Sequence, residues 1–241
     1  MKERHFGLTK YLPKFLIKYL DPIYFLFIKP DKYEHELNFW KNRYEDENHL
    51  FNNSHYEKLM LAMAEENDQN FLRDKIVADF GCGPRGSLQW IKSAKIKIGI
   101  DVLVDKFADN FFPNVISHGM VYVKCTESAI PIPSNYIDVL FSLNAIDHVD
   151  DFKKMSIEIV RIIKPGGEFI GSFNLNEPAT TCEPQSLTEE MVKEELLSNF
   201  TIKSYRITGF SGVNRYEPFF NGTLHYKKGE TATLWARAIK N

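Results

Sequence analysis

Two acidic residues and two glycines have the types and spacing of a small-molecule binding site: Asp79, Gly81, Gly83 and Asp101. Asp79 ends a short apolar run and precedes the glycines, a pattern typical of a buried parallel strand that enters a tight turn. Glycine has no Cβ and accepts positive φ, so the N–H groups of this turn can face a bound molecule. Asp101 ends a second apolar strand, where an acid of a doubly wound sheet can accept both hydroxyls of a ribose. These residues predict a nucleoside pocket.

The glycine-rich run at residues 81–86 also satisfies the pattern G-x-G-x-x-G. That pattern alone is weak evidence for a dinucleotide site. An NAD(P)-dependent oxidoreductase with a Rossmann domain is therefore one alternative. The sequence shows no obvious Tyr-x-x-x-Lys or comparable pair for hydride transfer. The absence of this pair is weak evidence against an oxidoreductase.

The wider context resembles the motifs of class I S-adenosylmethionine-dependent methyltransferases, which have a Rossmann-like fold. Residues 79–83, Asp-Phe-Gly-Cys-Gly, resemble the first motif of that family, and residues 98–101 and 163–170 resemble later ones. The third glycine of the family usually stands one place earlier, where this chain has Arg85. The resemblance is specific over residues 75–173 and loose beyond them. It implies S-adenosyl-L-methionine as the cofactor.

The resemblance also implies which residues bind the donor: Asp79, Gly81, Cys82, Gly83, Asp101, Val102, Glu127, Leu143 and Asn144. Asp79 and the glycine turn match the motif for the methionine portion, and Asp101 matches the acid for the ribose. Val102 would pack on the adenine. Glu127 falls near the acid that members often place at the adenine amino group. The backbone at the end of the fourth strand would close on the donor.

His148, shortly after the fourth strand, is a candidate general base. A neutral aliphatic hydroxyl is a poor nucleophile, and removal of its proton contributes roughly 10²- to 10⁴-fold to a rate. Histidine suits this task because its unperturbed pKa of about 6.5 leaves much of it neutral. Asp147 and Asp150 could orient the ring. The alternative role is a cap for the helix that begins near Asp150, and His55 or His225 would be the next histidine to test.

The composition is that of an ordinary globular protein of 241 residues, with 44% hydrophobic and 26% charged residues and a formal net charge of −2. This charge argues against a general nucleic-acid binder, which needs a basic surface. Cys82, Cys125 and Cys182 have no metal-ligand spacing and predict free thiols in a reducing compartment. Neither a secretory signal nor an uncharged run of roughly 18 residues is visible, so we expect a cytoplasmic protein. No metal ligands are predicted, and whether the reaction depends on a metal does not follow from the sequence.

Residues 1–70 lie outside the resemblance and predict an N-terminal helical cap, followed by a cofactor-binding domain over residues 71–241. Residues 1–30 mix aromatic and aliphatic residues with lysines. Such a segment could pack over the pocket or lie peripherally on a membrane, and both alternatives stay open. Residues 34–70 have two apolar stripes at helical spacing, which predict helices that face the core.

From residue 75 on, strand and helix signals alternate, which predicts an α/β fold with a doubly wound, mostly parallel sheet. The expected strands are residues 76–78, 96–100, 120–124, 137–142, 168–173, 200–208 and 231–239. The expected helices are residues 87–91, 104–112, 151–163 and 188–199. The pattern does not give the strand order. The resemblance implies a seven-stranded sheet whose last strand is antiparallel to the others.

The leading hypothesis is methyl transfer from S-adenosylmethionine to a hydroxyl of a small molecule or glycan. Residues 142–151 resemble a branch of the family often encoded with sugar and surface-glycan biosynthesis. Within this resemblance Asn174 and Glu183 fall where an acceptor would approach. The alternatives are the oxidoreductase and a member that binds the cofactor without turnover. The oligomeric state does not follow from the sequence.

Overall fold

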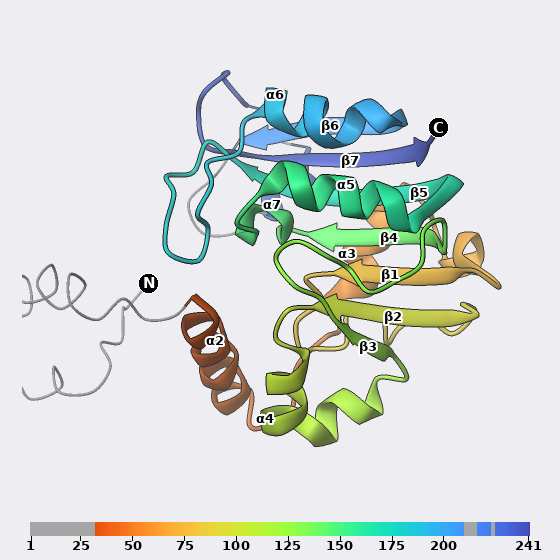
Figure 1. Ribbon diagram of the computed structural model, residues 1–241, viewed down its shortest axis with the longest axis vertical. Helices are drawn as coiled ribbons and strands as arrows, with labels where there is room; N and C mark the ends of the chain where they lie inside the picture. Colours follow the sequence, from red (N-terminus) through yellow and green to blue (C-terminus); the bar gives the residue numbers. More distant parts are fainter. Residues whose placement is uncertain (1–31, 210–215, 223–224) are drawn as a thin grey trace, which may run out of the picture.

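A seven-stranded sheet forms the centre of the computed structural model, which describes residues 32–209, 216–222 and 225–241 (Figure 1). Its strands are β1 (Ile76–Phe80), β2 (Ile96–Asp101), β3 (Val121–Lys124), β4 (Ile137–Leu143), β5 (Ile163–Leu175), β6 (Phe200–Gly209) and β7 (Ala232–Lys240). The order across the sheet is β3-β2-β1-β4-β5-β7-β6. β7 pairs antiparallel with β5 and β6, and the other neighbours are parallel. The expected mixed sheet is confirmed.

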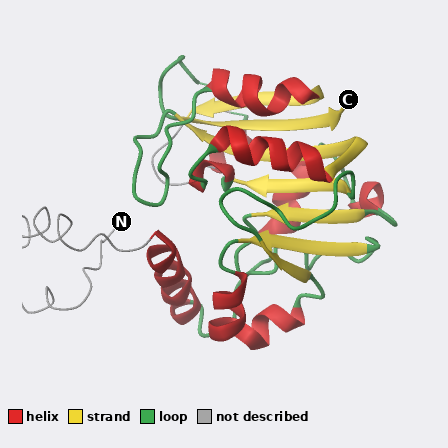
Figure 2. Cartoon of the chain, viewed as in Figure 1, coloured by secondary structure: helices red, strands yellow, loops and turns green. Residues whose placement is uncertain are grey.

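Helices cover both faces of this sheet, with α5 and α6 in front and α3 behind in the view of Figures 1 and 2. The helices are α2 (Lys32–Asp46), α3 (His55–Ala64), α4 (Val104–Ser117), α5 (Phe152–Ile162), α6 (Glu189–Met191) and α7 (Tyr216–Asn221). α6 continues into a π turn at Val192–Leu196 and a 3₁₀ turn at Leu197–Asn199. Thr188 caps α6 by accepting a hydrogen bond from the Met191 N–H. The helix expected over residues 188–199 is therefore present.

β1 shows how the core is divided between the two faces. Ile76, Ala78 and Phe80 belong to the apolar cluster that includes α5, whereas Val77 belongs to the cluster that includes α3. Successive side chains of a strand point to opposite faces, and both faces of β1 are buried. A parallel strand covered on both sides is apolar at consecutive positions, which is the pattern that predicted it.

The segment after β1 differs from the expectation of a helix over residues 87–91. The chain forms turns from residue 81 to residue 90. The glycines of this segment all have positive φ, which a right-handed helix does not accept. Beyond the glycines, the Gln89 N–H donates to the Gly86 carbonyl and the Ile91 N–H to the Leu88 carbonyl, each three residues back, as in successive turns. The helix prediction was wrong.

Aromatic contacts hold α2 beside α4. One face of α2 packs on α4 and on the chain that follows α2, through Leu37, Trp40, Tyr44, Phe51, Phe107 and Phe111. This contact confirms the first apolar stripe, and the burial of Leu59, Met60 and Met63 in α3 confirms the second. None of the helices that the structure describes is long and apolar enough to span a bilayer. Residues 1–30, with their alternative roles as cap or membrane contact, lie outside the described residues.

Phe111→Ala is expected to lower the free energy of unfolding by about 3 to 5 kcal/mol. Phe111 is 1% exposed, and its removal leaves a cavity between α2 and α4. Its neighbour Phe112 is 57% exposed, so Phe112→Ala is expected to change that free energy by less than about 0.5 kcal/mol. Urea unfolding of both variants measures the difference, and equal losses would contradict the packing of α2 on α4.

Candidate functional site

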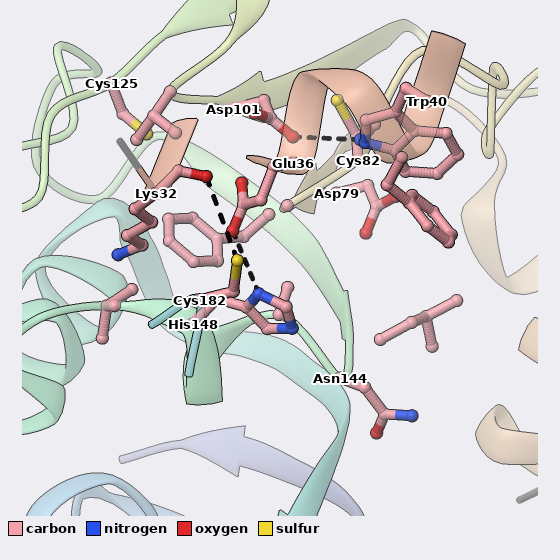
Figure 3. A pocket seen from close by; sticks show the side chains of 18 of the residues that line it. Lys32, Glu36, Trp40, Asp79, Cys82, Asp101, Cys125, Asn144, His148 and Cys182 are labelled. Atoms are coloured by element: carbon pink, nitrogen blue, oxygen red, sulfur yellow. Dashed lines mark hydrogen bonds and ion pairs between the residues drawn. The ribbon is translucent and has the colours of Figure 1, made fainter. Parts of the chain in front are cut away.

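A cavity of ≈ 480 Å³ lies at the carboxyl ends of β1, β2 and β4. This is the edge of an open α/β sheet where ligands bind, and the volume is usual for a small-molecule site. α2 forms the opposite wall (Figure 3). The predicted donor-binding residues and the predicted base line the cavity: Asp79, Gly81, Cys82, Gly83, Asp101, Val102, Glu127, Leu143, Asn144 and His148. The part of a ligand that each residue binds stays a prediction.

The turn after β1 is tied to the end of β2. The Gly81 N–H donates to the Ile100 carbonyl at 2.8 Å, and the Gly83 N–H donates to Asp101 Oδ2 at 3.0 Å. Gly81 has a φ of 71°, and a Cβ at this position would overlap the Cβ of Ala145. Only glycine allows so close an approach with positive φ. The turn therefore presents backbone rather than side chains to the cavity.

Asp79 carries an acceptor without a partner. The side chain is 3% exposed, and its Oδ2 accepts a hydrogen bond from Ser87 Oγ. Its Oδ1 has no hydrogen-bond partner among the described residues. Burial raises the pKa of Asp79 to about 7; the Ser87 hydrogen bond opposes this rise, and the Asp101 charge adds to it. Because a buried unpaired acceptor is costly, Asp79 is suited to bind a cationic ligand group.

Asp101 is held in place by two backbone donors. The Leu103 N–H donates to Oδ1 at 2.9 Å, and the Gly83 N–H donates to Oδ2. Burial raises the pKa of Asp101 to about 6, although both hydrogen bonds lower it. A carboxylate has about four lone-pair sites, so two backbone donors leave room for more. Asp101 can therefore accept ligand hydroxyls without losing its fixed position.

Glu127 joins the cavity to the beginning of α2. Its Oε1 accepts from Lys32 Nζ at 2.9 Å and from the Tyr33 hydroxyl at 2.7 Å, and its Oε2 accepts from the Asp150 N–H at 3.1 Å. The sequence analysis missed Lys32 and Tyr33 because they lie far along the chain in a segment without a motif. Glu127 thus fixes one end of the wall that α2 forms.

Asn144 directly follows Leu143, the last residue of β4, and has a φ of 47°. Its N–H donates to the Ser172 carbonyl at 3.1 Å, and its Oδ1 accepts from Ser172 Oγ at 2.7 Å. These bonds to β5 determine where the chain turns after β4. Asn144 lines the cavity, and its role in closing on a donor stays a prediction.

His148 lies between two carboxylates. Its Nδ1 is 3.1 Å from Glu36 Oε1 of α2, and its Nε2 is 3.4 Å from Glu183 Oε1 (Figure 3 shows the Glu36 pair). The alternative role as a helix cap is wrong, because Asp151 caps α5 by accepting from the Lys154 N–H at 2.9 Å. Glu183 therefore lies beside His148, and its contact with an acceptor stays a prediction.

The protonation state of His148 bears on its predicted role as a base. Burial lowers the pKa of His148, but hydrogen bonds to Glu183 and Glu36 and the charge of Asp147 raise it to about 10. The imidazolium is therefore the main form at neutral pH, and this form cannot accept a proton. A base role requires Nε2 to exchange Glu183 for the acceptor, and it stays a prediction.

Other residues named from the sequence are divided between the cavity and its surroundings. His55 lines the cavity, whereas His225 and Asn174 do not. All three cysteines are free thiols, as predicted. Cys182 lies at the wall of the cavity with Sγ 3.3 Å from His35 Nδ1, and burial raises the pKa of its thiol. The thiol is thus the resting form of Cys182.

Comparison with protein families adds an independent finding. Residues 78–171 match the family model described as a methyltransferase domain. S-adenosylmethionine is the cofactor that this domain implies. No curated protein matches the sequence.

Several solved structures resemble this chain in fold. A chain of the Haloferax volcanii complex with the Trm112 methyltransferase activator has 15% identity and a TM-score of 0.60, over 88% of this chain and 98% of that chain. An S-adenosylmethionine-dependent methyltransferase of Mesorhizobium loti has 16% identity and a TM-score of 0.54, and the match covers 74% of this chain and 96% of that chain. The [4+2]-cyclase SpnF has 21% identity and a TM-score of 0.56, over 76% and 80%. At these identities the likeness concerns the fold.

The methyltransferase domain has side chains that fit the cofactor. Asp79 Oδ1 is a buried acceptor with no partner among the described residues, as a carboxylate that binds an ammonium group should be. Asp101 is fixed beside the glycine turn with acceptor capacity for ribose hydroxyls. Val102 and Leu143 add apolar surface to the same cavity. The donor set therefore agrees with S-adenosylmethionine.

Gly81→Ala is expected to abolish cofactor binding, because the new Cβ overlaps Ala145 in the floor of the cavity. Gly166→Ala is a matched control. Gly166 has a similar φ of 75°, but no atom lies within 4 Å of the position of its Cβ. This control is expected to cost only the roughly 1 to 2 kcal/mol of left-handed backbone strain. Isothermal titration with S-adenosylhomocysteine compares the two, and intact binding by Gly81→Ala would refute the close approach.

Proposed function

We propose that the methyltransferase domain transfers a methyl group from S-adenosylmethionine to a hydroxyl oxygen of a small molecule or glycan. The observation that carries the proposal is that one cavity holds both the donor-binding residues and the ionisable groups around His148. When bound, the cofactor supplies an electrophilic methyl group on a positively charged sulfur. The protein has to hold donor and acceptor in contact and exclude water.

At the donor end, Asp79 and Asp101 bind the two polar parts of the cofactor. The free Oδ1 of Asp79 pairs with the ammonium of the methionine portion, and this pairing removes the cost of a buried unpaired acceptor. Asp101 accepts the ribose hydroxyls. Val102 packs on the adenine, and Glu127 approaches the adenine amino group while it keeps Lys32 and Tyr33 in place.

At the acceptor end, α2 closes the cavity and brings Glu36 to His148. With Nδ1 held by Glu36, the ring presents Nε2 away from α2. Nε2 then accepts the hydroxyl proton once the imidazolium has released its Nε2 proton and the acceptor has replaced Glu183. This arrangement follows the general pattern in which a carboxylate orients the base. It supports a hydroxyl as the acceptor, whereas the proposal of a glycan rests on the sequence resemblance alone.

Two observations bear on the alternatives. A dinucleotide site places the pyrophosphate at the N-terminus of the helix after the first strand, but here residues 81–90 form turns. This favours S-adenosylmethionine over NAD. The fold of the cyclase SpnF shows that this architecture also supports a reaction other than methyl transfer. A cofactor-binding protein without methyl transfer is therefore tested by product formation and not by binding.

The test is a thermal-shift measurement with S-adenosylmethionine, S-adenosylhomocysteine, NAD and NADP. A ligand that binds only the native state at 100 times its Kd stabilises it by about 2.7 kcal/mol, or roughly 5 to 10 °C for a domain of this size. We expect this shift with the first two ligands and none with the others. Asp101→Ala is expected to weaken S-adenosylhomocysteine binding by roughly 1 to 3 kcal/mol.

An equal or larger shift with NAD would overturn the cofactor assignment. Turnover is measured separately, as S-adenosylhomocysteine released in the presence of a panel of hydroxyl-containing acceptors. Binding without release on any acceptor would favour the non-catalytic alternative. Release with amines but not with alcohols would refute the hydroxyl acceptor and leave methyl transfer intact.

The affinity for S-adenosylhomocysteine is expected to rise with pH up to about 7. Burial raises the pKa of Asp79 to about 7 in the free protein, whereas pairing with an ammonium requires the ionised carboxylate. Below this pH, binding must first release the proton, so Kd is expected to increase by up to about tenfold for each pH unit lost. Titration calorimetry from pH 5.5 to 8.5 measures the slope. Asp79→Asn should bind weakly with a flatter profile, and an unchanged slope would assign the proton elsewhere.

A further inference from the structure

Asp147 is a buried carboxylate that the proposed donor site does not use. The residue is 3% exposed, and neither Oδ1 nor Oδ2 has a hydrogen-bond partner among the described residues. A buried carboxylate without partners is among the more costly arrangements in a protein. It is usually retained where a ligand or ion compensates it. The carboxylate of Asp147 is therefore suited to bind a cation.

Two other ligand groups lie beside Asp147. Asp147, His148 and Glu183 each offer one ligand atom, and these atoms all lie within 4.8 Å of one another. His148 Nε2 and Glu183 Oε1 are 3.4 Å apart. Two ligand atoms of one tetrahedral Zn²⁺ ion are also separated by roughly 3.4 Å, given metal–ligand distances of about 2.1 Å. Small side-chain rotations would bring all three groups onto one ion.

We infer that Asp147, His148 and Glu183 form a binding site for a divalent transition-metal ion. One imidazole and two carboxylates suit Zn²⁺ or Mn²⁺ better than a thiolate-preferring ion. Glu36 completes the arrangement from α2, because it binds Nδ1 of His148 and leaves Nε2 for the ion. A carboxylate on the second ring nitrogen is the usual support of a histidine ligand.

The position of this site connects it to the acceptor end of the cavity. His148 belongs both to the cluster and to the cavity wall, whereas the donor-binding Asp79 and Asp101 lie at the ends of β1 and β2. An ion bound here would hold the acceptor oxygen and lower the pKa of its hydroxyl. This role rests on the proposed methyl transfer, but the binding of the ion does not. The ion and the proposed general base would both use Nε2 of His148. A bound ion would therefore take the place of His148 in activating the hydroxyl.

A second pair of ligand groups lies on the same wall and has to be distinguished. Cys182 Sγ and His35 Nδ1 are 3.3 Å apart and could attract Zn²⁺. This pair offers two ligands, and burial raises the pKa of the Cys182 thiol, which disfavours the thiolate. The structure therefore favours the cluster with Asp147.

The test uses the full chain without an affinity tag, stripped with EDTA and titrated calorimetrically with Zn²⁺ and with Mn²⁺ in the absence of cofactor and acceptor. We expect one equivalent of at least one ion to bind. Asp147→Asn and Glu183→Gln are each expected to weaken binding at least about tenfold. Asp150→Asn is the control, because it removes the same charge from an exposed residue that pairs with Lys32 and offers no ligand to the cluster.

A stability measurement separates a binding site from a merely structural carboxylate. In EDTA, Asp147→Asn is expected to melt close to the temperature of the parent protein, because the change removes a buried carboxylate without a hydrogen bond but also a charge that stabilises the His148 imidazolium. With the ion present, the parent protein is expected to be the more stable of the two. A melting temperature that falls in EDTA would assign Asp147 a structural role and overturn the proposal.

Three binding results would also overturn it. The first is no binding of either ion. The second is an affinity that Asp147→Asn and Glu183→Gln leave unchanged. The third is binding that Cys182→Ser removes and Asp147→Asn does not, which would place the ion at the thiol. Because no cofactor or acceptor is present, failure of methyl transfer would leave each of these results valid.

Discussion

The close approach of the turn after β1 to the chain after β4 is the constraint on which the site depends. Gly81 meets Ala145 at a distance that no side chain permits, and the neighbouring Gly83 N–H fixes Asp101. These contacts bring the ends of three parallel strands to one cavity. The N–H groups of this turn donate to the end of β2, and the carboxylates of Asp79 and Asp101 line the donor end.

Uncompensated buried carboxylates are the second common feature of the site. Asp79 and Asp147 are each 3% exposed, and each has carboxylate oxygens without partners among the described residues. Asp79 lies near the end of β1, and Asp147 follows β4 next to His148 of the cavity wall. A protein gains stability by pairing or removing such groups, so their presence indicates that ligands complete them. The donor would complete one and the inferred ion the other.

α2 turns an open sheet edge into an enclosed cavity. Its apolar face packs on α4, and its polar face sends Lys32 to Glu127 and Glu36 to His148. The helix has no buried residue of its own, so these contacts hold it in place. Closure of the cavity therefore depends on ion pairs that a ligand could rearrange, whereas the sheet behind them is a packed apolar core.

The sequence by itself determined the strands, most helices and many of the residues that line the cavity, because apolar periodicity and glycine spacing are local properties of the chain. Asp79, Gly83 and Asp101 could be named before their contacts were known. Only the tertiary structure decided the strand order, the loss of the first helix and the surroundings of His148. Glu36 lies 112 residues from His148 along the chain, and no local pattern connects them. Such contacts arise from packing between distant segments, so the charge of His148 and the isolation of Asp147 follow from the folded protein alone.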